Sequence, residues 1–300
     1  MNMLFGVEKA GFMEFKKVTL DDIEMLSASL ADYRGRVCDI SPANLVFWRD
    51  YYDISVCFDC DRLALRFGDM DGFVSYWCDA SRAIIDKIIA HEGGEARFSC
   101  LSEQEKEFFF QNYSCGELLH ERDWDDYLYR AEDIMTLAGK KYCGQRNHIN
   151  KFNKLYPDAE FVEITAQNAA EVKEFCYGYF HEFGRERADV AEYEESKLYE
   201  QLDCIEKYSQ HTLAVFIDGA VAGFSIGETV GDTLIVHTEK ADTRFAGVYP
   251  ALVKAFACRY ATEGGYINRE EDCGEAGLRT SKLSYHPTEI IKKYSLIARA

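Results

Sequence analysis

The sequence of 300 residues has no surplus of basic side chains, because 34 lysines and arginines stand against 52 aspartates and glutamates. The net charge is −18 and the isoelectric point is about 4.8. A protein that coats nucleic acid presents a broad basic face to the phosphates. That class is therefore disfavoured, although a local basic patch is compatible with an acidic total. The sequence also has no apolar run near the roughly 18 residues that a membrane span needs.

Two further signals are missing. The opening residues, MNMLFGVEKAGFMEF, contain no apolar stretch of the kind that precedes a signal-peptide cleavage site. The 11 cysteines are irregularly spaced, and the C-x-x-C formed by Cys57 and Cys60 has no second pair of ligands at zinc-site spacing. We therefore expect a cytoplasmic protein with reduced thiols and without a metal site.

The sequence does contain enough apolar residues, 47% of the total, for a packed core. Its periodicity predicts one order of elements twice: a strand, two helices, three strands, a helix, a strand and a helix. We interpret this order as two tandem units, residues 1–132 and 133–300. Each would have a mostly antiparallel sheet flanked by helices, which is an α+β fold of mixed α/β layers.

In the second half, helices are predicted at 133–155, 166–183, 190–208, 247–263 and 275–284, and strands at 160–164, 211–217, 220–229, 233–240 and 266–270. Asp218-Gly219 predicts a tight hairpin between two of these strands. Strand 125–130 is predicted to close the first half. The order of elements resembles that of the GNAT acyltransferase fold.

In the GNAT fold, acyl-CoA enters where the fourth strand splays from the fifth, and its pyrophosphate contacts the loop before the next helix. This sequence has Arg244 and Gly247 there, in the spacing Arg-x-x-Gly, with Tyr249 where the family has a small residue. A helix N-terminus offers unpaired N–H groups to phosphates, and glycine lets the backbone approach them. The resemblance implies a cofactor site at these three residues, while a plain loop with a surface arginine is the alternative. The equivalent loop of the first half, Trp77 to Ser81, has neither glycine nor arginine, so we expect no cofactor there.

Predicted strand 233–240 carries three polar residues. Alternation places His237 and Glu239 on one face, and Lys240 follows them. Either of the first two could accept a proton from a nucleophilic amine once its pKa is tuned. We predict Glu239, and secondarily His237, as the base, and Lys240 as a substrate contact. The alternative is a half-buried strand whose polar side chains face solvent or pair with neighbours.

One block of the acidic sequence, residues 139–154, is basic. It could receive the phosphates of a nucleotide, a lipid head group or an RNA end. We predict substrate contacts at four of its residues: Lys140, Arg146, Asn147 and Asn150. The alternative is a solvated helical face that balances acidic neighbours.

Three blocks together resemble one family. They are LAGKKYCGQRNHINKFNKLYP (137–157), IVHTEKA (235–241) and YINREEDCGEAGLRTSKLSYHP (266–287). They are similar to the phosphatidylglycerol lysyltransferase C-terminal domain family, and the likeness extends from about residue 14 to 295. The resemblance implies a tandem GNAT-like fold related to the Fem-type aminoacyltransferases. In the best-known members this fold moves an aminoacyl group from a charged tRNA to a lipid head group, beside a large membrane-spanning region that we do not find in this sequence.

The third block follows the fifth strand of the second unit, at the rim of the expected cleft and opposite Glu239. Cationic side chains there suit a carboxylate or phosphate of a substrate. We predict that five residues of the block anchor the substrate: Asn268, Arg269, Glu270, Arg279 and Lys282. GNAT enzymes often use a tyrosine after strand five to protonate the leaving thiol, and the resemblance implies this role for Tyr285. The alternative is a salt network within the block that links Arg269, Glu270, Glu271 and Arg279.

The sequence therefore predicts an acyl- or aminoacyltransferase that acts on a small amine or hydroxyl acceptor. The donor is acyl-CoA or aminoacyl-tRNA, and in the second case the 3′ end of tRNA is a partner. A non-catalytic ligand-binding or regulatory module on the same scaffold is the alternative. The donor, the acceptor and the oligomeric state stay open at this point.

Overall fold

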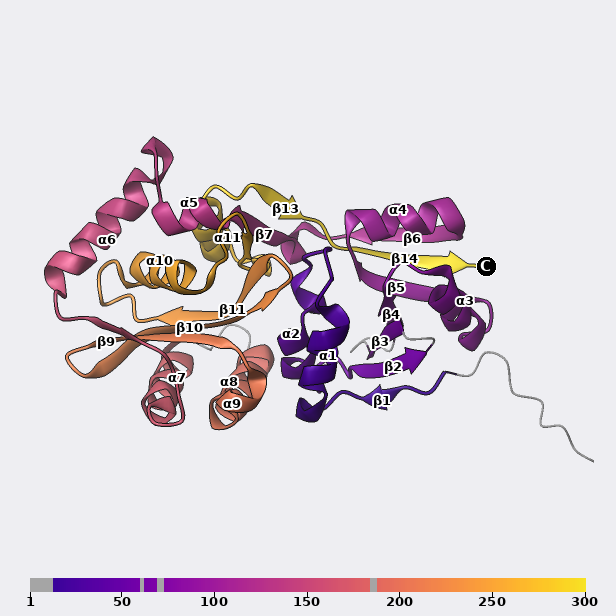
Figure 1. Cartoon of the computed structure of the whole chain (residues 1–300), viewed down its shortest axis with the longest axis horizontal. Coiled ribbons are helices and arrows are strands. Elements are labelled where there is room, and N and C mark those ends of the chain that lie inside the picture. Colours follow the sequence, from indigo (N-terminus) through magenta and orange to yellow (C-terminus); the bar gives the residue numbers. More distant parts are fainter. Residues whose placement is uncertain (1–12, 60–61, 69–72, 184–187) are drawn as a thin grey trace, which may run out of the picture. The chain divides into compact units, whose positions relative to one another are not determined.

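The computed structural model describes residues 13–59, 62–68, 73–183 and 188–300 (Figure 1). The chain forms two compact units, and each is assembled from separate segments. Unit 1 contains the described residues up to Thr19, together with Trp48–Glu121 and Lys293–Ala300; unit 2 contains Leu20–Phe47 and Arg122–Lys292. Each unit has a mostly antiparallel sheet flanked by helices, so the predicted fold class is confirmed.

Unit 1 has a seven-stranded sheet in the order β1-β2-β3-β4-β5-β14-β6. Only β4 and β5 run parallel, and they share one paired position, Tyr76 with Phe98. The strands are β1 (Lys16–Lys17), β2 (Ser55–Asp59), β3 (Arg62–Gly68), β4 (Val74–Cys78), β5 (Glu95–Leu101), β6 (Ser114–His120) and β14 (Tyr294–Arg299). Its helices are α3 (Arg82–His91) and α4 (Glu103–Asn112). Cys57 lies in β2, and Cys60 lies outside the described residues.

Unit 2 has a seven-stranded sheet in the order β13-β7-β12-β11-β10-β9-β8. Its strands are β7 (Asp126–Arg130), β8 (Glu160–Val162), β9 (His211–Ile217), β10 (Ala220–Val230), β11 (Thr233–Ala241), β12 (Tyr266–Asn268) and β13 (Glu289–Ile291). Neighbouring strands are antiparallel except for β11 and β12. The hairpin between β9 and β10 turns at Asp218 and Gly219, whose φ angles of 52° and 79° suit a mirror-image turn.

The helices of unit 2 cover both faces of its sheet. They are α1 (Ile23–Leu30), α2 (Pro42–Phe47), α5 (Ala131–Thr136), α6 (Cys143–Leu155), α7 (Ala169–Phe183), α8 (Ala188–Asp203), α9 (Ile205–Tyr208), α10 (Val248–Tyr260) and α11 (Ala276–Leu283). In Figure 1, α6 and α10 lie on one face, and α7, α8 and α9 lie on the other. Among the described residues, no helix combines the length and the apolar character that crossing a membrane requires.

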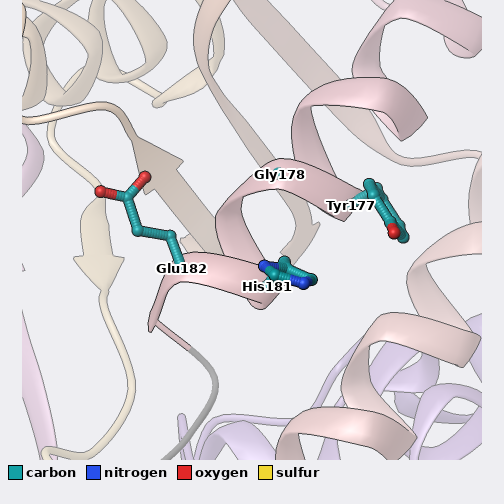
Figure 2. A pocket seen from close by; sticks show the side chains of 4 residues that line it. All are labelled: Tyr177, Gly178, His181 and Glu182. Carbon is teal, nitrogen blue, oxygen red and sulfur yellow. The ribbon is translucent and has the colours of Figure 1, made fainter.

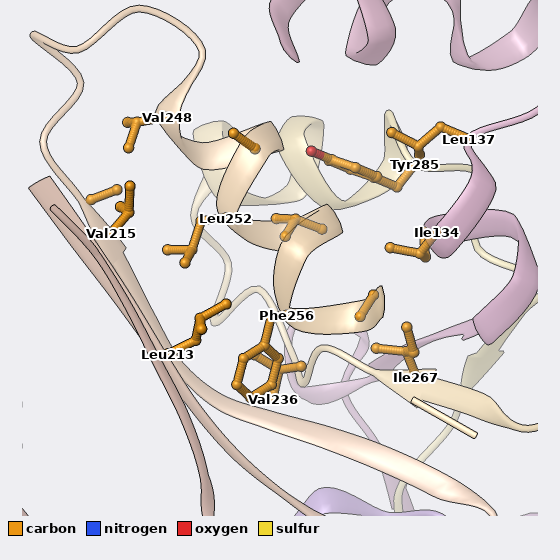
Figure 3. Close-up of a cluster of buried hydrophobic side chains, with 14 of the residues drawn as sticks. Ile134, Leu137, Leu213, Val215, Val236, Val248, Leu252, Phe256, Ile267 and Tyr285 are labelled. Carbon is orange, nitrogen blue, oxygen red and sulfur yellow. The ribbon is translucent and has the colours of Figure 1, made fainter. Parts of the chain in front are cut away.

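The main core of unit 2 lies between α10 and the sheet. Val248, Leu252 and Phe256 recur every four residues and therefore share one face of the helix. They pack toward Leu213 of β9 and Val236 of β11, as Figure 3 shows. Burial of such side chains contributes about 1.5–3 kcal/mol each, so this cluster fixes α10, and with it the loop before α10, against β11.

The two units of the structure are not separated by a single boundary at residue 132, where the sequence predicted one. Strand β7, expected to close the first half, pairs with β12 and β13 in unit 2. Residues 20–47 also belong to unit 2. Strands β13 and β14 were not predicted, and β14 pairs with β5 and β6 in unit 1. Local periodicity identifies a strand but not its sheet, because strand pairing is set by contacts far apart in the sequence.

Two predicted helices are interrupted. The helix expected at 133–155 stops at Leu137 (φ 48°) and Gly139 (φ 86°) and resumes as α6. These left-handed conformations are incompatible with a continuous helix. The helix expected at 190–208 is divided into α8 and α9 at Cys204, whose ψ of 28° departs from helical geometry.

Strands β11 and β12 part soon after they meet. They share three paired positions, of which the last is Ile235 with Asn268. The predicted strand 266–270 ends at Asn268 because Glu270 takes a left-handed φ of 57° and its carbonyl accepts from Tyr127 N–H on β7. β11 also bulges at His237, since Val236 and Thr238 pair with consecutive residues of β10. Past Ile235, β11 therefore has no backbone pairing with β12. We call this parting of the strands the opening, and the side chains of His237 and Glu239 lie across it.

The bulge leaves little space on the neighbouring strand. A Cβ atom at Gly227 of β10 would lie 2.3 Å from the carbonyl oxygen of Ile235. We expect Gly227→Ala to lower the free energy of unfolding of unit 2 by about 1–3 kcal/mol, because the strands must shift to admit the methyl group. Gly178→Ala in α7 is the matched control, since a Cβ there meets nothing within 4 Å. Urea unfolding followed by circular dichroism measures both, and equal stability of the two variants would contradict the tight approach at the bulge.

Candidate functional site

His237, the bulged residue of β11, lies between two carboxylates. Its Nδ1 is 2.8 Å from Glu270 Oε1, and its Nε2 is 3.0 Å from Glu228 Oε1. Burial alone would lower the pKa of His237, but the hydrogen bonds to Glu228 and Glu270 outweigh burial and raise the pKa to about 9. At neutral pH the ring is then an imidazolium that donates from both nitrogens. A role as a base requires that one of these hydrogen bonds be broken first.

Backbone and side-chain donors of the α2 segment hold both carboxylates. Asn44 Nδ2 donates to Glu270 Oε1 at 2.8 Å, and the backbone N–H of Ala43 donates to Glu228 Oε1 at 2.9 Å. Burial raises the pKa of Glu270, and the hydrogen bond from His237 opposes this rise. Glu228 and Asn44 were not predicted as site residues. The sequence gives only a weak indication of them: each is a polar residue within a largely apolar helix or strand.

Glu239 and Arg269 form a second cross-link over the parting of β11 and β12. Glu239 Oε1 is 2.7 Å from Arg269 Nη2, and the two side chains are 12% and 9% exposed. The Arg269 guanidinium also lies over the ring of Tyr285, 4.9 Å from its centre. Arg269 Nη1 is buried and has no hydrogen-bond partner in the described part of the chain. The two predicted residues are thus brought together as an ion pair with one donor unused.

Lys282 and Tyr285 support the backbone around this pair. Lys282 Nζ donates to the carbonyl of Arg269 at 2.5 Å and to the carbonyl of Glu271. Burial lowers the pKa of Lys282, and Glu271 opposes this. Tyr285 is 4% exposed, and burial raises its pKa to about 12. The side chain of Lys282 therefore fixes the turn after β12, and Tyr285 lies in the core beneath Arg269.

Arg279 is engaged with carboxylates of unit 2. Its Nη2 is 2.6 Å from Asp272 Oδ1 and 2.6 Å from Asp123 Oδ1. Burial would raise the pKa of Asp272, but hydrogen bonds from Arg279 and Tyr127 outweigh it and lower the pKa to about 2. The alternative of a salt network within the third block is thus realised at Arg279, although with Asp123 and Asp272 rather than with Glu270 and Glu271.

Asn268 is fully buried and orients a neighbouring carboxylate. Its Nδ2 donates to Asp126 Oδ2 at 2.9 Å and to the carbonyl of Arg36 at 2.7 Å. Asp126 Oδ1 and Glu271 Oε2 each lie 3.3 Å from Cys38 Sγ. The sulfur of Cys38 and one carboxylate oxygen each of Asp126 and Glu271 lie within 4.8 Å of one another. This spacing fits a bound metal ion, and it equally fits a thiol that donates hydrogen bonds to two carboxylates. Cys38 and Asp126 were not predicted, and their distance in sequence explains why.

Lys240 points away from the parting of the strands. Its Nζ is 2.9 Å from Glu194 Oε1 on α8 and lies over the rings of Tyr179 and Phe180 on α7. Burial would lower the pKa of Lys240, but Glu194 and Tyr179 together with other neighbours outweigh burial, and the pKa is raised. Lys240 therefore lies with α7 and α8, apart from the His237 and Glu239 cross-links.

The loop between β11 and α10 has the expected glycine geometry. Gly247 takes a φ of 86°, and a Cβ there would lie 2.3 Å from the carbonyl oxygen of His148 on α6. Arg244 is 77% exposed and is held by Asp242 Oδ2 at 2.6 Å from its Nη2. Burial raises the pKa of Tyr249, the residue that replaces a small one. Glycine is thus required here by the backbone alone, and α6 packs directly against the loop.

The basic block divides into supporting and exposed residues. Arg146 Nη1 donates to the carbonyls of Leu137 and Gly139, and so stabilises the break before α6. Lys140, Lys151 and Lys154 are exposed. Asn147 and Asn150 are also exposed on α6, with Asn147 Nδ2 lying 3.7 Å from Cys143 Sγ. Lys151 and Lys154 thus give α6 two exposed cationic side chains, and α6 packs against the loop at Gly247 through His148 and Phe152.

A shallow hollow lies along the C-terminal part of α7 (Figure 2). It is lined by Tyr177, Gly178, His181 and Glu182. Tyr177 and His181 point to one side of the helix and Glu182 to the other. The Glu182 charge, after that of Asp242, raises the pKa of Arg244, so this end of α7 lies near the loop before α10. None of these four residues was predicted.

Two sheets in tandem, each with a parallel central pair whose strands part, define a tandem GNAT-like fold. Residues 31–297 match the family described as phosphatidylglycerol lysyltransferase, C-terminal, and the chain belongs to this family. The resemblance noted in the three sequence blocks is confirmed.

Solved structures agree with this assignment. A conserved protein of unknown function from Bacteroides thetaiotaomicron has a TM-score of 0.89 and 29% identity, over 96% of this chain and 100% of that one. L-PGS from Bacillus licheniformis has a TM-score of 0.63 and 14% identity, over 91% and 90% of the two chains. FemX has a TM-score of 0.59 and 9% identity, over 94% and 97%. The last two show the fold alone.

Among curated proteins, an uncharacterized protein of Mycoplasmoides gallisepticum is 26% identical over 179 residues. The matching region is 59% of this chain and 57% of that protein, so it spans little more than half the length of the relative.

The His237 cross-link predicts a pH-dependent stability. Because the pKa in the folded state, about 9, lies above the ordinary 6.5, the stabilisation is fully present below about pH 6.5 and is lost as the pH rises through 9. The difference in unfolding free energy between wild type and His237→Gln should therefore fall by on the order of 3 kcal/mol between pH 6 and about pH 10. His148→Gln, at an exposed histidine of α6, is the control. Urea unfolding at each pH measures the difference; a His237→Gln difference independent of pH would contradict the buried imidazolium.

Proposed function

We propose that this protein transfers an acyl or aminoacyl group from acyl-CoA or aminoacyl-tRNA to an amine or hydroxyl acceptor. The reaction takes place in unit 2, where β12 parts from β11. The observation that carries the proposal is the Glu239–Arg269 pair beside this opening, with Arg269 Nη1 unused, in a chain of the lysyltransferase family. A carboxylate and a spare donor in one place suit direct attack on a carbonyl group.

We assign roles to four of the predicted residues. Glu239 is the base that receives the proton of the acceptor, and Tyr285 is the acid for the leaving group. His237 and Lys282 hold the strands and the turn in position through Glu270 and two backbone carbonyls. Removing a positioned base typically slows a reaction by about 10²–10⁴-fold.

The surface around the opening favours aminoacyl-tRNA as the donor. Lys151 and Lys154 are exposed on α6, and α6 packs against Gly247 at the start of α10. A nucleic acid that is bound on α6 could therefore bring its 3′ end to the loop before α10. The motif of Arg244 and Gly247 supports acyl-CoA instead, although the guanidinium of Arg244 is already engaged with Asp242.

A non-catalytic ligand-binding module is the second candidate. The observation that favours it is the loop before α10, where a partly buried tyrosine, Tyr249, replaces a small residue and Arg244 is paired with Asp242. In that case donors would bind without being consumed.

Glu239→Gln tests the chemical role. We expect the purified protein to release CoA thiol from acetyl-CoA, or deacylated tRNA from lysyl-tRNA, when a mixture of amines and alcohols is added. Glu239→Gln should lower kcat by at least about 10²-fold because the base is lost. Glu163→Gln is the control, since Glu163 is 56% exposed and paired with Arg259. No release by the wild type with either donor would favour the binding module.

The donor is tested by charge reversal on α6. Replacing Lys151 and Lys154 by glutamate should weaken lysyl-tRNA binding by about tenfold or more and reduce the salt dependence of binding by about two ions. The control reverses Lys173 of α7 and Lys207 of α9, on the other face of the sheet. Fluorescence anisotropy at several salt concentrations measures binding. Equal losses in the two double variants would remove the tRNA version of the proposal.

A further inference from the structure

Arg269 carries a hydrogen-bond donor that the described protein does not use. Its Nη2 donates to Glu239 Oε1 at 2.7 Å, and its side chain is only 9% exposed. Its Nη1 is buried and has no partner in the described part of the chain. An unpaired donor that is closed to water destabilises the folded state, so native proteins keep few of them. The geometry therefore points to a group that enters the site and accepts from Nη1.

Neighbouring donors at this place already have protein acceptors. Both ring nitrogens of His237 face carboxylates. Lys282 Nζ donates to two backbone carbonyls, and the hydroxyl of Tyr129 donates to the carbonyl of Lys282 at 2.8 Å. The unused N–H groups of Arg269 Nη1 are thus the ones available to an incoming oxygen.

The charge of the pair decides which oxygen fits. Glu239 already neutralises the guanidinium, so a carboxylate or phosphate at Nη1 would leave a buried negative charge without compensation. A neutral carbonyl oxygen accepts the same hydrogen bond at a much lower desolvation cost. The carboxylate or phosphate that the sequence suggested for Arg269 is therefore disfavoured, and a carbonyl group is favoured.

We propose that Arg269 Nη1 binds the carbonyl oxygen of the donor's acyl or aminoacyl group and stabilises the negative charge that this oxygen gains during attack. The acceptor's proton neutralises Glu239 in the same step, so the positive charge of Arg269 is then available to the oxygen. The inference rests on the proposed function, because it identifies the part of the donor that the same site recognises.

In this step the acceptor nitrogen or oxygen forms a bond to the carbonyl carbon, and the π-electron pair moves to the oxygen held by Arg269. The acceptor's proton passes to Glu239. Collapse of the tetrahedral species restores the C=O bond and breaks the C–S bond of a thioester or the C–O bond of a tRNA ester. The leaving sulfur or oxygen takes a proton from the Tyr285 hydroxyl, and the proton held by Glu239 then restores that hydroxyl, so that no proton is gained or lost overall.

Arg269→Lys is the central variant. Lysine keeps the positive charge beside Glu239 but has no second forked nitrogen to place at Nη1. We expect kcat to fall by about 10²–10³-fold with the KM of the donor changed less than about threefold, because a bond made mainly in the transition state is lost. Arg259→Lys, in an exposed ion pair with Glu163, is the control. Added guanidinium ion should restore part of the activity of Arg269→Ala, which a merely structural role would not produce.

A measurement on the wild type avoids dependence on any variant. Acetyl-CoA and lysyl-tRNA, each labelled with ¹³C at the acyl carbonyl, are bound without an acceptor and examined by infrared difference spectroscopy. The carbonyl band of the bound donor should move to lower wavenumber, and Arg269→Lys should reduce this shift. A band that does not move in the wild type, or a kcat of Arg269→Lys equal to that of the wild type, would overturn the inference. Absence of turnover together with an Arg269-dependent shift would instead sink the proposed transferase and leave the carbonyl site standing.

Discussion

The parting of β12 from β11 after Asn268 is the constraint on which the rest of unit 2 depends. Glu270 takes a left-handed conformation, its carbonyl accepts from Tyr127 of β7, and Lys282 holds the carbonyls of Arg269 and Glu271. β12 therefore remains paired with β7, and the second half of β11 has no backbone pairing with β12. Side chains fill this gap instead of backbone hydrogen bonds, and His237 and Glu239 reach across it to Glu270 and Arg269.

These two cross-links are a costly way to hold a fold together. Each charge loses its hydration on burial, and well-packed apolar side chains of similar volume would often stabilise a protein as well or better. The ion pairs of His237 and Arg269 therefore add little net stability over such apolar packing. They are better explained as contacts that hold the side chains of a polar site in fixed positions. The net charge of −18 adds a constraint of its own, because an acidic protein repels an anionic ligand unless a local cationic face receives it.

The sequence contained the local part of this arrangement. Asp218-Gly219 predicted the hairpin, and the alternation of residues 233–240 predicted β11. What it could not predict came from distant contacts. The donors that hold Glu228 and Glu270 come from Ala43 and Asn44, which lie 185 and 226 residues earlier in the sequence. The alternation of polar and apolar residues also does not predict the β-bulge that places His237 between two carboxylates. The exchange of β7 and β14 between the halves follows from sheet pairing that no local pattern records.

A crystal structure with a donor analogue that retains its carbonyl but cannot react, S-(2-oxopropyl)-CoA or a 3′-amide mimic of lysyl-adenosine, would show whether Arg269 binds the acyl carbonyl. We expect density for the acyl end between residues 236–241 of β11 and residues 268–271, with the carbonyl oxygen within hydrogen-bond distance of Arg269 Nη1. An analogue bound elsewhere, with the Glu239–Arg269 pair undisturbed and nothing at Nη1 but solvent, would contradict this expectation.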